Sequence, residues 1–307
     1  SAVVKRVDLD PAAVEDVVMG CVTPIGEQGA NIGRLAVLNA GWPVTVPAVT
    51  LNRMCGSSQQ AIHFAAQAIA AGDMDIAVGA GVECMSRVTM GADYPEQFYA
   101  GIPYDLIPQG ISAELICDKW EISREALDRF SYESHQKAAA ATAAGYFKAE
   151  IIPVAVTQNG NPVMLDYDEG FRTNVDMAKM GQLRPAFRAN GRFTAGSSSQ
   201  ISDGAAAVLL ASAEGLKRHN LTPRARIVAR AVVGSDPVLM LDGPIPATHK
   251  ILARAGLTID QIDTIEINEA FASVVLAWMH EIRPDPARVN PTGGAIALGH
   301  PLGATGA

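Results

Sequence analysis

"LNRMCGSSQQAIHFAAQAIAAG", residues 51–72, joins the end of an apolar run to a long alanine-rich segment. The apolar run, "PAVTLNRM" at 47–54, predicts a buried strand. The segment that follows repeats its apolar residues at helical spacing, which predicts a helix with one apolar stripe, formed by Ala61, Ile62, Ala65, Ala66 and Ile69. Cys55 stands at the junction, close to the predicted amino terminus of that helix.

Cys55 has two interpretations. Unpaired amides and the helix dipole at a helix N-terminus stabilise a thiolate, which lowers the thiol pKa from about 8.5 and produces a nucleophile. The alternative is a small buried hydrophobe, which is the commoner role of a lone cysteine. We assign this second role to Cys21, Cys84 and Cys117.

The composition is that of a globular protein. The chain has 307 residues, 49% of them hydrophobic, which is enough for a large core. It contains no apolar run of about 18 residues and no readable signal sequence, so we expect a cytoplasmic protein without membrane contact. The four cysteines form no C-x-x-C pair, which predicts reduced thiols and no metal site. A net charge of −8 argues against nucleic acid, although local arginines can still bind a small anion.

Short β-rich runs alternate with alanine-rich helical segments, which is the pattern of an α/β fold with a parallel or mixed sheet. The predicted strands are "EDVVMGCV" (15–22), "PAVTLNRM" (47–54), "DIAVGAGV" (75–82), "RIVARAVVG" (226–234), "DTIEIN" (263–268) and "ARVNP" (287–291). From Met85 to roughly Pro185 aromatic, proline and charged residues are denser. This portion contains one clear helix, with Ser123 as N-cap and Gly145 as stop, and we predict that it is an inserted loop domain covering a site on the main body.

An internal repeat with an offset of 248 residues indicates two duplicated α/β halves. Its seven matched pairs are Val3, Val4, Val7, Leu9, Val14, Val17 and Met19 with Ile251, Leu252, Ala255, Leu257, Ile262, Ile265 and Ile267. The alternative is that any helix followed by a buried strand gives such a match. A strand-like segment precedes the second copy only, and a helix and strand follow the first copy only, so we expect the printed chain to be incomplete at both ends.

Two polar groups near the C-terminus have the composition of a functional site. The stretch "NPTGGAIALGHPLGATGA" (290–307) surrounds His300 with glycines that let a backbone approach a ligand closely. In "EINEAFA" (266–272), Asn268 and Glu269 follow a predicted strand, and the carboxyl ends of strands are where α/β proteins build their sites. The other role for Glu269 is a carboxylate that stabilises a helix start.

Four motifs together resemble the thiolases, acyltransferases that act on acetyl-CoA and 3-ketoacyl-CoA: "NRMCGSSQQA", "SSSQISDGAAA", "NEAF" and "GGAIALGHPLGATG". They occur in the order of that family, and the resemblance covers essentially the whole printed chain. It implies duplicated αβαβα layers with an inserted loop domain. Residues 1–84 are then the N-terminal half without its first strand, 85–190 the loop domain, and 191–307 the rest of that half followed by the C-terminal half without its last strands.

The resemblance also implies roles for single residues. Cys55 is the nucleophile that takes the acyl group, His300 is the base that accepts its proton, and Asn268 holds a water that completes an oxyanion pocket with His300. The backbone amide of Cys55 contributes to a second pocket. The coenzyme A thioester is a substrate, no cofactor is bound permanently, and the CoA-binding residues are Arg172, Phe187, Ser199 and Phe271, with Arg184 and Arg188 as candidates for contacts with the phosphates.

The sequence departs from the thiolase pattern at three places. The family has a second catalytic cysteine in a C-x-G-x-G motif beyond the histidine loop, and the printed residues do not supply it. A His-Met pair of small-substrate thiolases is replaced by Pro108 and Gln109, which indicates a different acyl pocket. The stretch from Met90 to Leu106 is shorter than the loop that joins dimers in tetrameric relatives, so we expect a homodimer.

Two further functions are compatible with these residues. One is another condensing enzyme of the same fold, although such enzymes lack the "NEAF" and "GHPLGATG" pairing seen here. The other is a catalytically impaired, thiolase-like protein that only binds acyl-CoA, which the absent second cysteine favours. Acyl chain length and the physiological direction of the reaction are not legible in the sequence, because thiolysis and condensation share one site.

Overall fold

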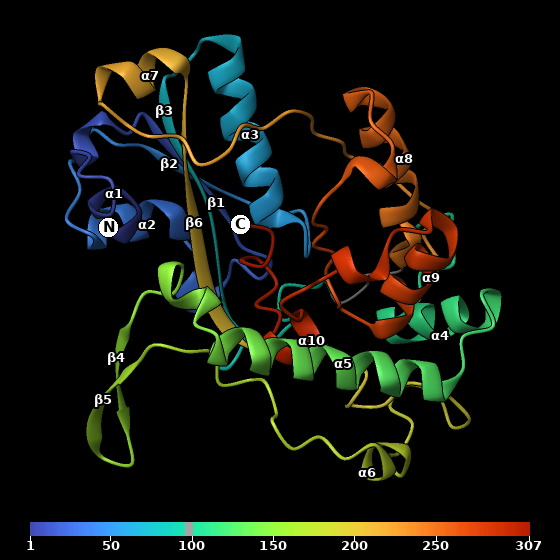
Figure 1. Cartoon of the computed structure of the whole chain (residues 1–307). Helices are drawn as coiled ribbons and strands as arrows, with labels where there is room; N and C mark the ends of the chain where they lie inside the picture. Colours follow the sequence, from blue (N-terminus) through green and yellow to red (C-terminus); the bar gives the residue numbers. More distant parts are fainter. Residues whose placement is uncertain (96–100) are drawn as a thin grey trace. The chain divides into compact units, whose positions relative to one another are not determined.

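The computed structural model describes residues 1–95 and 101–307 (Figure 1). The chain divides into two compact units. Unit 1 comprises Ser1–Phe98, Ile201–Val228 and His300–Ala307, and unit 2 comprises Tyr99–Gln200 and Ala229–Gly299. The short stretch 90–106, which led us to expect a dimer, lies partly outside the described residues. The division into segments 1–84, 85–190 and 191–307 stays a prediction.

Unit 1 is built on a mixed four-stranded sheet of order β2-β1-β3-β6. Its strands are β1 (Asp16–Gly20), β2 (Ala48–Leu51), β3 (Ile76–Cys84) and β6 (Asp203–Ala211). β1 is parallel to both β2 and β3, whereas β6 runs antiparallel to β3. The mixed α/β class and the first three predicted strands are confirmed. β6, with the alanine-rich sequence "DGAAAVLLA", was not among the predicted strands.

Helices cover both faces of this sheet. Adjacent strand residues point to opposite faces, so Val18 joins α3 (Ser57–Ala71) in one apolar cluster while Val17 joins α2 (Ile32–Asn39) and α1 (Ala2–Lys5) in another. The face toward α3 is built from small residues. A Cβ added at Gly79 would lie 2.7 to 2.9 Å from atoms of Ile62, including its backbone nitrogen. Glycine is therefore what lets α3 approach β3.

The other elements of unit 1 are short and flank the sheet. They are η1 (Pro11–Ala13), η2 (Gly26–Gln28) and α7 (Ala213–Arg218). Asp10 caps η1 by accepting from the amide of Ala12, and Ser212 caps α7 by accepting from the amide of Gly215.

Unit 2 is mainly helical, with one two-stranded antiparallel hairpin, β4–β5. Its elements are α4 (Gln109–Lys119), α5 (Arg124–Ala143), η3 (Tyr146–Ala149), β4 (Val154–Gln158), β5 (Asn161–Leu165), α6 (Met177–Gly181), η4 (Met240–Asp242), α8 (Pro244–Ala255), η5 (Ile259–Gln261), α9 (Ala272–Ile282), η6 (Pro286–Arg288) and α10 (Ala295–Leu298). One core cluster gathers around Phe193 and Ile116, and a second around Trp278.

The predicted ends of α5 are confirmed. The Ser123 hydroxyl accepts from the Ala126 amide and caps the helix. Gly145 follows the helix with φ +78°, a left-handed conformation that costs glycine little and ends the helical turn.

Three predicted strands were wrong as continuous strands. Residues 226–234 form none, since a strand exists only where its backbone pairs with a neighbour and this segment has no ladder partner among the described residues. The segments 263–268 and 287–291 share one parallel bridge, between Ile265 and Val289, and η6 occupies part of the second segment. Of these three apolar runs, 263–268 and 287–291 thus pair at a single bridge, whereas 226–234 forms no strand and exposes Val228.

The 248-residue offset has a structural counterpart. Asp10 is the N-cap residue of η1, and Thr258, 248 residues later, is the N-cap residue of η5. The pattern continues with Val17, whose amide donates to the Pro47 carbonyl, and Ile265, whose amide donates to the Arg288 carbonyl. Both contacts belong to parallel pairs. The same turn and the same first bridge thus recur in both units.

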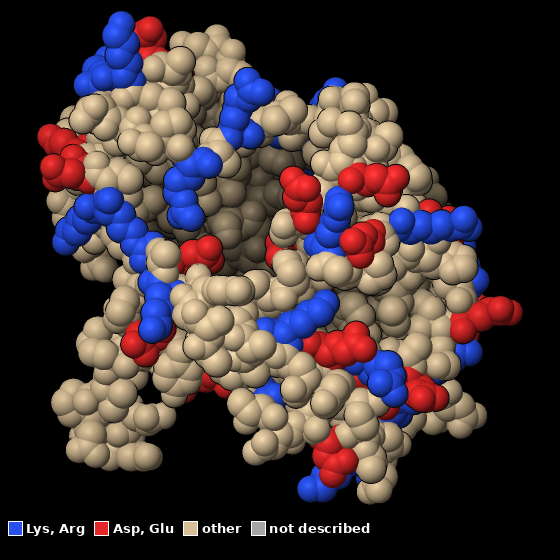
Figure 2. Space-filling model, in the orientation of Figure 1, with Lys and Arg blue, Asp and Glu red and all other residues tan. Residues whose placement is uncertain are grey.

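The surface carries charges of both signs. Lys and Arg are interspersed with Asp and Glu over the face shown in Figure 2. Of the described helices, none is both long and apolar enough to cross a membrane.

We expect Gly79→Ala to destabilise the protein by about 1–3 kcal/mol, because the added methyl meets the backbone of Ile62 as well as its side chain. Thermal or urea unfolding measures the change. The control is Gly234→Ala, where an added Cβ has no neighbour within 4 Å. Equal stabilities of the two variants would contradict the close helix-to-strand packing.

Candidate functional site

Cys55 lies in a tight turn between β2 and α3 that side chains of unit 1 hold in place. Met54, immediately before the cysteine, has φ +46°, an unusual value for a residue with a side chain. Its amide donates to Asn52 Oδ1 at 2.8 Å, and Asn52 Nδ2 donates to the Val22 carbonyl at 2.7 Å. Ser57 Oγ accepts from the Arg53 amide and donates to the Met54 carbonyl at 2.6 Å. The strained turn is therefore fixed on both sides of Cys55.

Cys55 packs against a small apolar cluster of Val22, Met85 and Leu302. Burial raises the pKa of the Cys55 thiol to about 11, and the charge of Glu83 acts in the same direction. α3 begins two residues after the cysteine, as expected, but the expected lowering of the pKa is absent because desolvation outweighs the stabilisation by backbone amides. Cys55 is therefore a neutral thiol at pH 7, and it needs a base in order to react.

His300 opens the glycine-rich loop 300–307 and is buried, with 2% of its surface exposed. Its Nδ1 lies 2.6 Å from Thr305 Oγ1, and that hydroxyl donates to the Pro301 carbonyl at 3.0 Å. A hydroxyl has one proton, so both contacts form together only when Nδ1 carries the imidazole proton. This arrangement leaves Nε2 as a proton acceptor. Burial lowers the pKa of His300 to about 4, so the ring is neutral at pH 7.

The loop 300–307 is seated on unit 1 by backbone contacts. The Gly303 amide donates to Glu83 Oε2 at 2.9 Å, and the Gly306 amide donates to Ser58 Oγ at 2.8 Å. A Cβ at Gly303 would lie 2.7 Å from Glu83 Oε2 and 2.7 Å from the Val82 carbonyl oxygen. Glycine is required there by the close approach, and Leu302 of the same loop contributes to the cluster around Cys55. Unit 1 therefore holds the Cys55 turn and the His300 loop side by side.

Asn268 and Glu269 belong to unit 2. Glu269 is buried and accepts from Ser134 Oγ at 2.6 Å, from Asn290 Nδ2 at 2.9 Å and from the Ile296 amide at 3.2 Å. Burial raises the pKa of its carboxyl group. Glu269 thus joins α5 to the loop before α10, which differs from a carboxylate that only stabilises a helix start. The convergence of Asn268 with Cys55 and His300 stays a prediction.

Two of the predicted CoA-binding residues are in contact within unit 2. The rings of Phe187 and Phe271 meet edge to face, with centroids 5.6 Å apart and an interplanar angle of 74°. Phe193 packs on Phe271 in the same manner at 5.6 Å. A Cβ at Gly110 would collide with the Phe187 ring, so this glycine makes room for the aromatic cluster.

The other two residues of this predicted set lie on segments that unit 2 fixes through the backbone. The Ser199 amide donates to the Ala270 carbonyl at 3.0 Å, which places Ser199 beside the "NEAF" segment. The Arg172 amide donates to His135 Nδ1 at 3.1 Å. Burial and the charge of Arg172 lower the pKa of His135 to about 4, so this imidazole is neutral and able to accept. The side chain of Arg172 itself is exposed.

Arg188 was a candidate for phosphate contacts, but it is engaged in ion pairs. Two of its nitrogens each donate to Asp118 at 3.0 Å, and Nε lies 3.5 Å from buried Glu114. These contacts hold the loop that leads to Phe193, because Glu114 also accepts from the amides of Arg192 and Phe193. Arg188 therefore has a structural role in unit 2.

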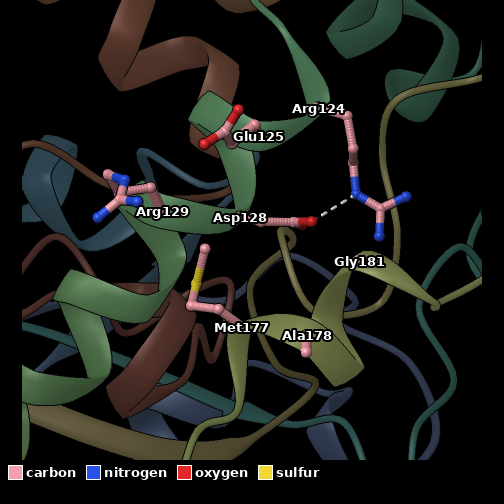
Figure 3. Close-up of a pocket in the computed structure, with 7 residues that line it drawn as sticks. All are labelled: Arg124, Glu125, Asp128, Arg129, Met177, Ala178 and Gly181. Carbon is pink, nitrogen blue, oxygen red and sulfur yellow. Dashed lines mark hydrogen bonds and ion pairs between the residues drawn. The ribbon is translucent and has the colours of Figure 1, made fainter.

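A hollow of about 490 Å³ lies between the first turns of α5 and α6 (Figure 3). It is lined by Arg124, Glu125, Asp128, Arg129, Met177, Ala178 and Gly181, none of them a predicted site residue. Arg124 Nε donates to Asp128 at 2.7 Å, and Arg124 Nη2 donates to the Met180 carbonyl at 2.5 Å. Arg124, on the wall of this hollow, thus binds the backbone of α6, and the segment after α6 leads to Phe187.

The sequence identified the two loops of unit 1 but missed the residues that hold them. These residues are Asn52, Ser57, Glu83 and Thr305, and the sequence around most of them does not mark them as functional. Glu83 is the exception in part, because a charged residue inside the apolar run "IAVGAGVEC" must find donors when it is buried. The other three belong to residue types that also occur in ordinary loops.

Two family models match the chain. The thiolase N-terminal domain matches residues 1–214, and the thiolase C-terminal domain matches residues 221–307. Together they cover nearly all of the chain. The matches define the class of the protein, an acyltransferase of the α/β type.

Curated thiolases are similar to this chain over nearly its whole length. A steroid 3-ketoacyl-CoA thiolase, FadA6, from Mycobacterium tuberculosis is 52% identical over 98% of this chain and 76% of its own length. A beta-ketoadipyl-CoA thiolase from Acinetobacter baylyi is 44% identical over 96% and 79%, respectively. A 3-ketoacyl-CoA thiolase from Vibrio cholerae is 46% identical over 97% and 79%. The chain belongs to the thiolase family, whose members act on CoA thioesters.

The protein should lose stability as the pH falls from about 6.5 to about 4. The pKa of His300 and that of His135 are both lowered to about 4 in the folded state, so the unfolded chain binds more protons within this window. Above pH 6.5 these imidazoles are neutral in the folded and in the unfolded chain, so stability no longer depends on their protonation.

Urea unfolding at several pH values measures this dependence. Between pH 6.5 and 4, His300→Asn should reduce the slope of the unfolding free energy against pH by up to about 1.4 kcal/mol per pH unit. The control is His249→Asn, a substitution at an exposed histidine. An unchanged slope in His300→Asn would contradict the buried neutral imidazole.

Proposed function

We propose that this chain catalyses the reversible thiolysis of 3-ketoacyl-CoA, with Cys55 as the acyl carrier and His300 as its base. The observation that supports the proposal is that unit 1 holds a half-buried neutral thiol, Cys55, beside the loop of a buried neutral imidazole, His300, whose Nδ1 carries the proton. Family membership and relatives at 44–52% identity support the same reaction class.

In the proposed acylation the Cys55 sulfur bonds to the carbonyl carbon of the acyl donor while its proton passes to His300 Nε2. The bond from that carbon to the leaving group then breaks, and the leaving group takes the proton that His300 Nε2 received. Because Cys55 is protonated at neutral pH, proton transfer must accompany the attack. The acyl group is released when the thiol of CoA, or the C2 carbon of acetyl-CoA, attacks the Cys55 thioester.

The developing oxyanion needs hydrogen-bond donors. We assign one pocket to His300 with a water held by Asn268, and part of a second to the Cys55 amide. Preorganised donors of this kind contribute roughly 3 kcal/mol each to the transition state. The support for the first pocket is that Asn268 lies next to Glu269, whose buried carboxylate fixes this segment.

We assign CoA binding to Arg172, Ser199, Phe187 and Phe271. The edge-to-face contact of the two phenylalanines supports a common apolar wall for the pantetheine arm. Arg172 lies on a segment that His135 fixes, and its exposed guanidinium is suited to the anionic end of CoA. CoA enters as substrate in this scheme.

The finer architecture belongs to the same proposal. We infer duplicated αβαβα layers with an inserted loop domain, supported by the recurrence of the capped 3₁₀ turn and its following parallel bridge. We also infer a homodimer, for which the edge position of β2 with its exposed Val49 is the structural support. A cytoplasmic location agrees with four cysteines that are free thiols.

The decisive experiment is incubation with acetyl-CoA followed by mass spectrometry. We expect an acetyl adduct of about 42 Da on Cys55, which fits the covalent intermediate of this chemistry. The adduct should be absent in Cys55→Ser and strongly reduced in His300→Ala. Acylation elsewhere, or undiminished acylation in His300→Ala, would contradict the assigned roles. An adduct with no release to CoA would favour an acyl-CoA-binding protein.

Arg172→Ala should raise KM for CoA substrates about tenfold and leave kcat nearly unchanged, because the lost contact is remote from the reacting atoms. Steady-state thiolysis kinetics measure both constants. Lys179→Ala, an exposed residue of α6, is the control for a general loss of surface charge. A fall in kcat without a change in KM would remove Arg172 from the CoA site.

A further inference from the structure

Glu83, at the carboxyl end of β3, is a buried carboxylate with 2% of its surface exposed. Oε2 accepts from the Val22 amide at 2.8 Å and from the Gly303 amide at 2.9 Å. Oε1 accepts from the Thr23 amide at 3.1 Å and from Gln28 Nε2 at 2.9 Å. The Cys21 thiol adds a weaker contact, with Sγ 3.8 Å from Oε1. All of these donors are neutral, and they come from the loop after β1, from η2 and from the loop 300–307.

These contacts connect the two loops that carry Cys55 and His300. From Gly303 the path runs through Glu83 to the Val22 amide. The carbonyl of Val22 accepts from Asn52 Nδ2, and Asn52 Oδ1 accepts from the amide of Met54, the neighbour of Cys55. Every step lies in unit 1, and every donor and acceptor is a backbone group or a side-chain amide or carboxylate.

We infer that Glu83 is a positioning residue for the reaction, because its carboxylate fixes the Cys55 turn and the His300 loop at the separation that proton transfer requires. This inference rests on the proposed function. Proton transfer needs heavy atoms within about 3 Å of each other, so a shift of either loop lowers the rate steeply. A misplacement of 1 Å can cost about 100-fold in rate.

The chemistry of the site requires a carboxylate. Each oxygen of Glu83 faces two N–H groups, so replacing one oxygen by an amide NH₂ sets donors against donors. The space is equally restricted, since a Cβ at Gly303 would touch Glu83 Oε2. A glutamine at position 83 therefore has the right volume but cannot accept all of these hydrogen bonds. An aspartate keeps the negative charge, but its carboxylate lies one methylene farther from the donors.

A buried carboxylate that only stabilises the fold predicts something different. Glu114 is equally buried and accepts from two backbone amides in unit 2. Loss of such a clamp lowers the unfolding temperature and reduces activity only in proportion to the unfolded fraction. A positioning role instead lowers kcat in the folded variant and changes how Cys55 reacts.

The experiment compares Glu83→Gln, Glu83→Asp and Glu15→Gln with the unsubstituted chain. Glu15 is a control for the loss of a carboxylate that accepts from two backbone amides, those of Asp75 and Ile76, at an exposed position just before β1. Three quantities are measured for each protein: kcat and KM for thiolysis, the unfolding temperature, and the pH dependence of Cys55 alkylation by iodoacetamide.

We expect Glu83→Gln to lose about 100-fold in kcat with less than threefold change in KM, as a displacement of about 1 Å implies. Its alkylation midpoint should move to lower pH, since the charge of Glu83 contributes to the raised pKa of Cys55. Glu83→Asp should lose about tenfold in kcat with an unshifted midpoint, because charge is kept and geometry is not. Glu15→Gln should match the unsubstituted chain in kcat.

The inference is wrong if folded Glu83→Gln and Glu83→Asp keep kcat within threefold, or if their activity falls only with the unfolded fraction. It is also wrong if neither variant folds, since Glu83 then serves the fold alone. Absence of thiolysis and of Cys55 acylation in the unsubstituted chain would instead refute the proposed function, and this result is distinct because alkylation by iodoacetamide does not require thiolase activity.

Discussion

The close approach of backbone to backbone on one face of the unit 1 sheet is the constraint on which the candidate site depends. The face toward α3 lacks side chains at Gly20, Gly79 and Gly81. The helix α3 occupies the space that side chains would fill, so an added Cβ at any of these glycines would overlap its atoms. Because α3 can approach closely, its first turn brings Ser58 within reach of the Gly306 amide. The absence of side chains thus allows the Cys55 turn and the His300 loop to share one small volume.

Three buried glutamates each bind a segment that is distant in sequence by accepting hydrogen bonds from its backbone. Glu83, Glu114 and Glu269 are each at most 2% exposed, and each accepts at least one backbone N–H from a segment distant in sequence. Burying a carboxylate is costly unless donors replace its hydration, so each glutamate defines where the donor segment must lie. Glycine-rich loops have little intrinsic order, and such a carboxylate supplies the order from outside. This division of roles explains why the loop 300–307 can be short of regular structure and still hold His300 in one position.

The parts of the fold that could be predicted are those specified by local pattern. Apolar runs identified β1, β2 and β3, and the Ser123 cap and Gly145 stop bounded α5, because these signals lie within one element. Pairing is not local. Nothing in "DGAAAVLLA" says that it pairs antiparallel with β3, and nothing in residues 226–234 says that a ladder partner is missing among the described residues. The same holds for the candidate site. Sequence motifs identified Cys55 and His300, whereas the role of Thr305 follows only from the 2.6 Å contact between its Oγ1 and His300 Nδ1 in the folded loop.

The direction of the Cys55 pKa shows the same limit and has a consequence for the chemistry. Local sequence places the thiol near a helix start, which favours a thiolate, but burial by distant residues outweighs it and raises the pKa of the thiol to about 11. Burial also lowers the pKa of His300 to about 4, so a resting thiolate and imidazolium pair is disfavoured on both sides. In the proposed reaction, charge separation therefore becomes favourable only when a carbonyl oxygen takes up negative charge beside fixed donors. In such a site the nucleophile stays in its protonated, weakly nucleophilic form until the carbonyl group of a substrate is bound.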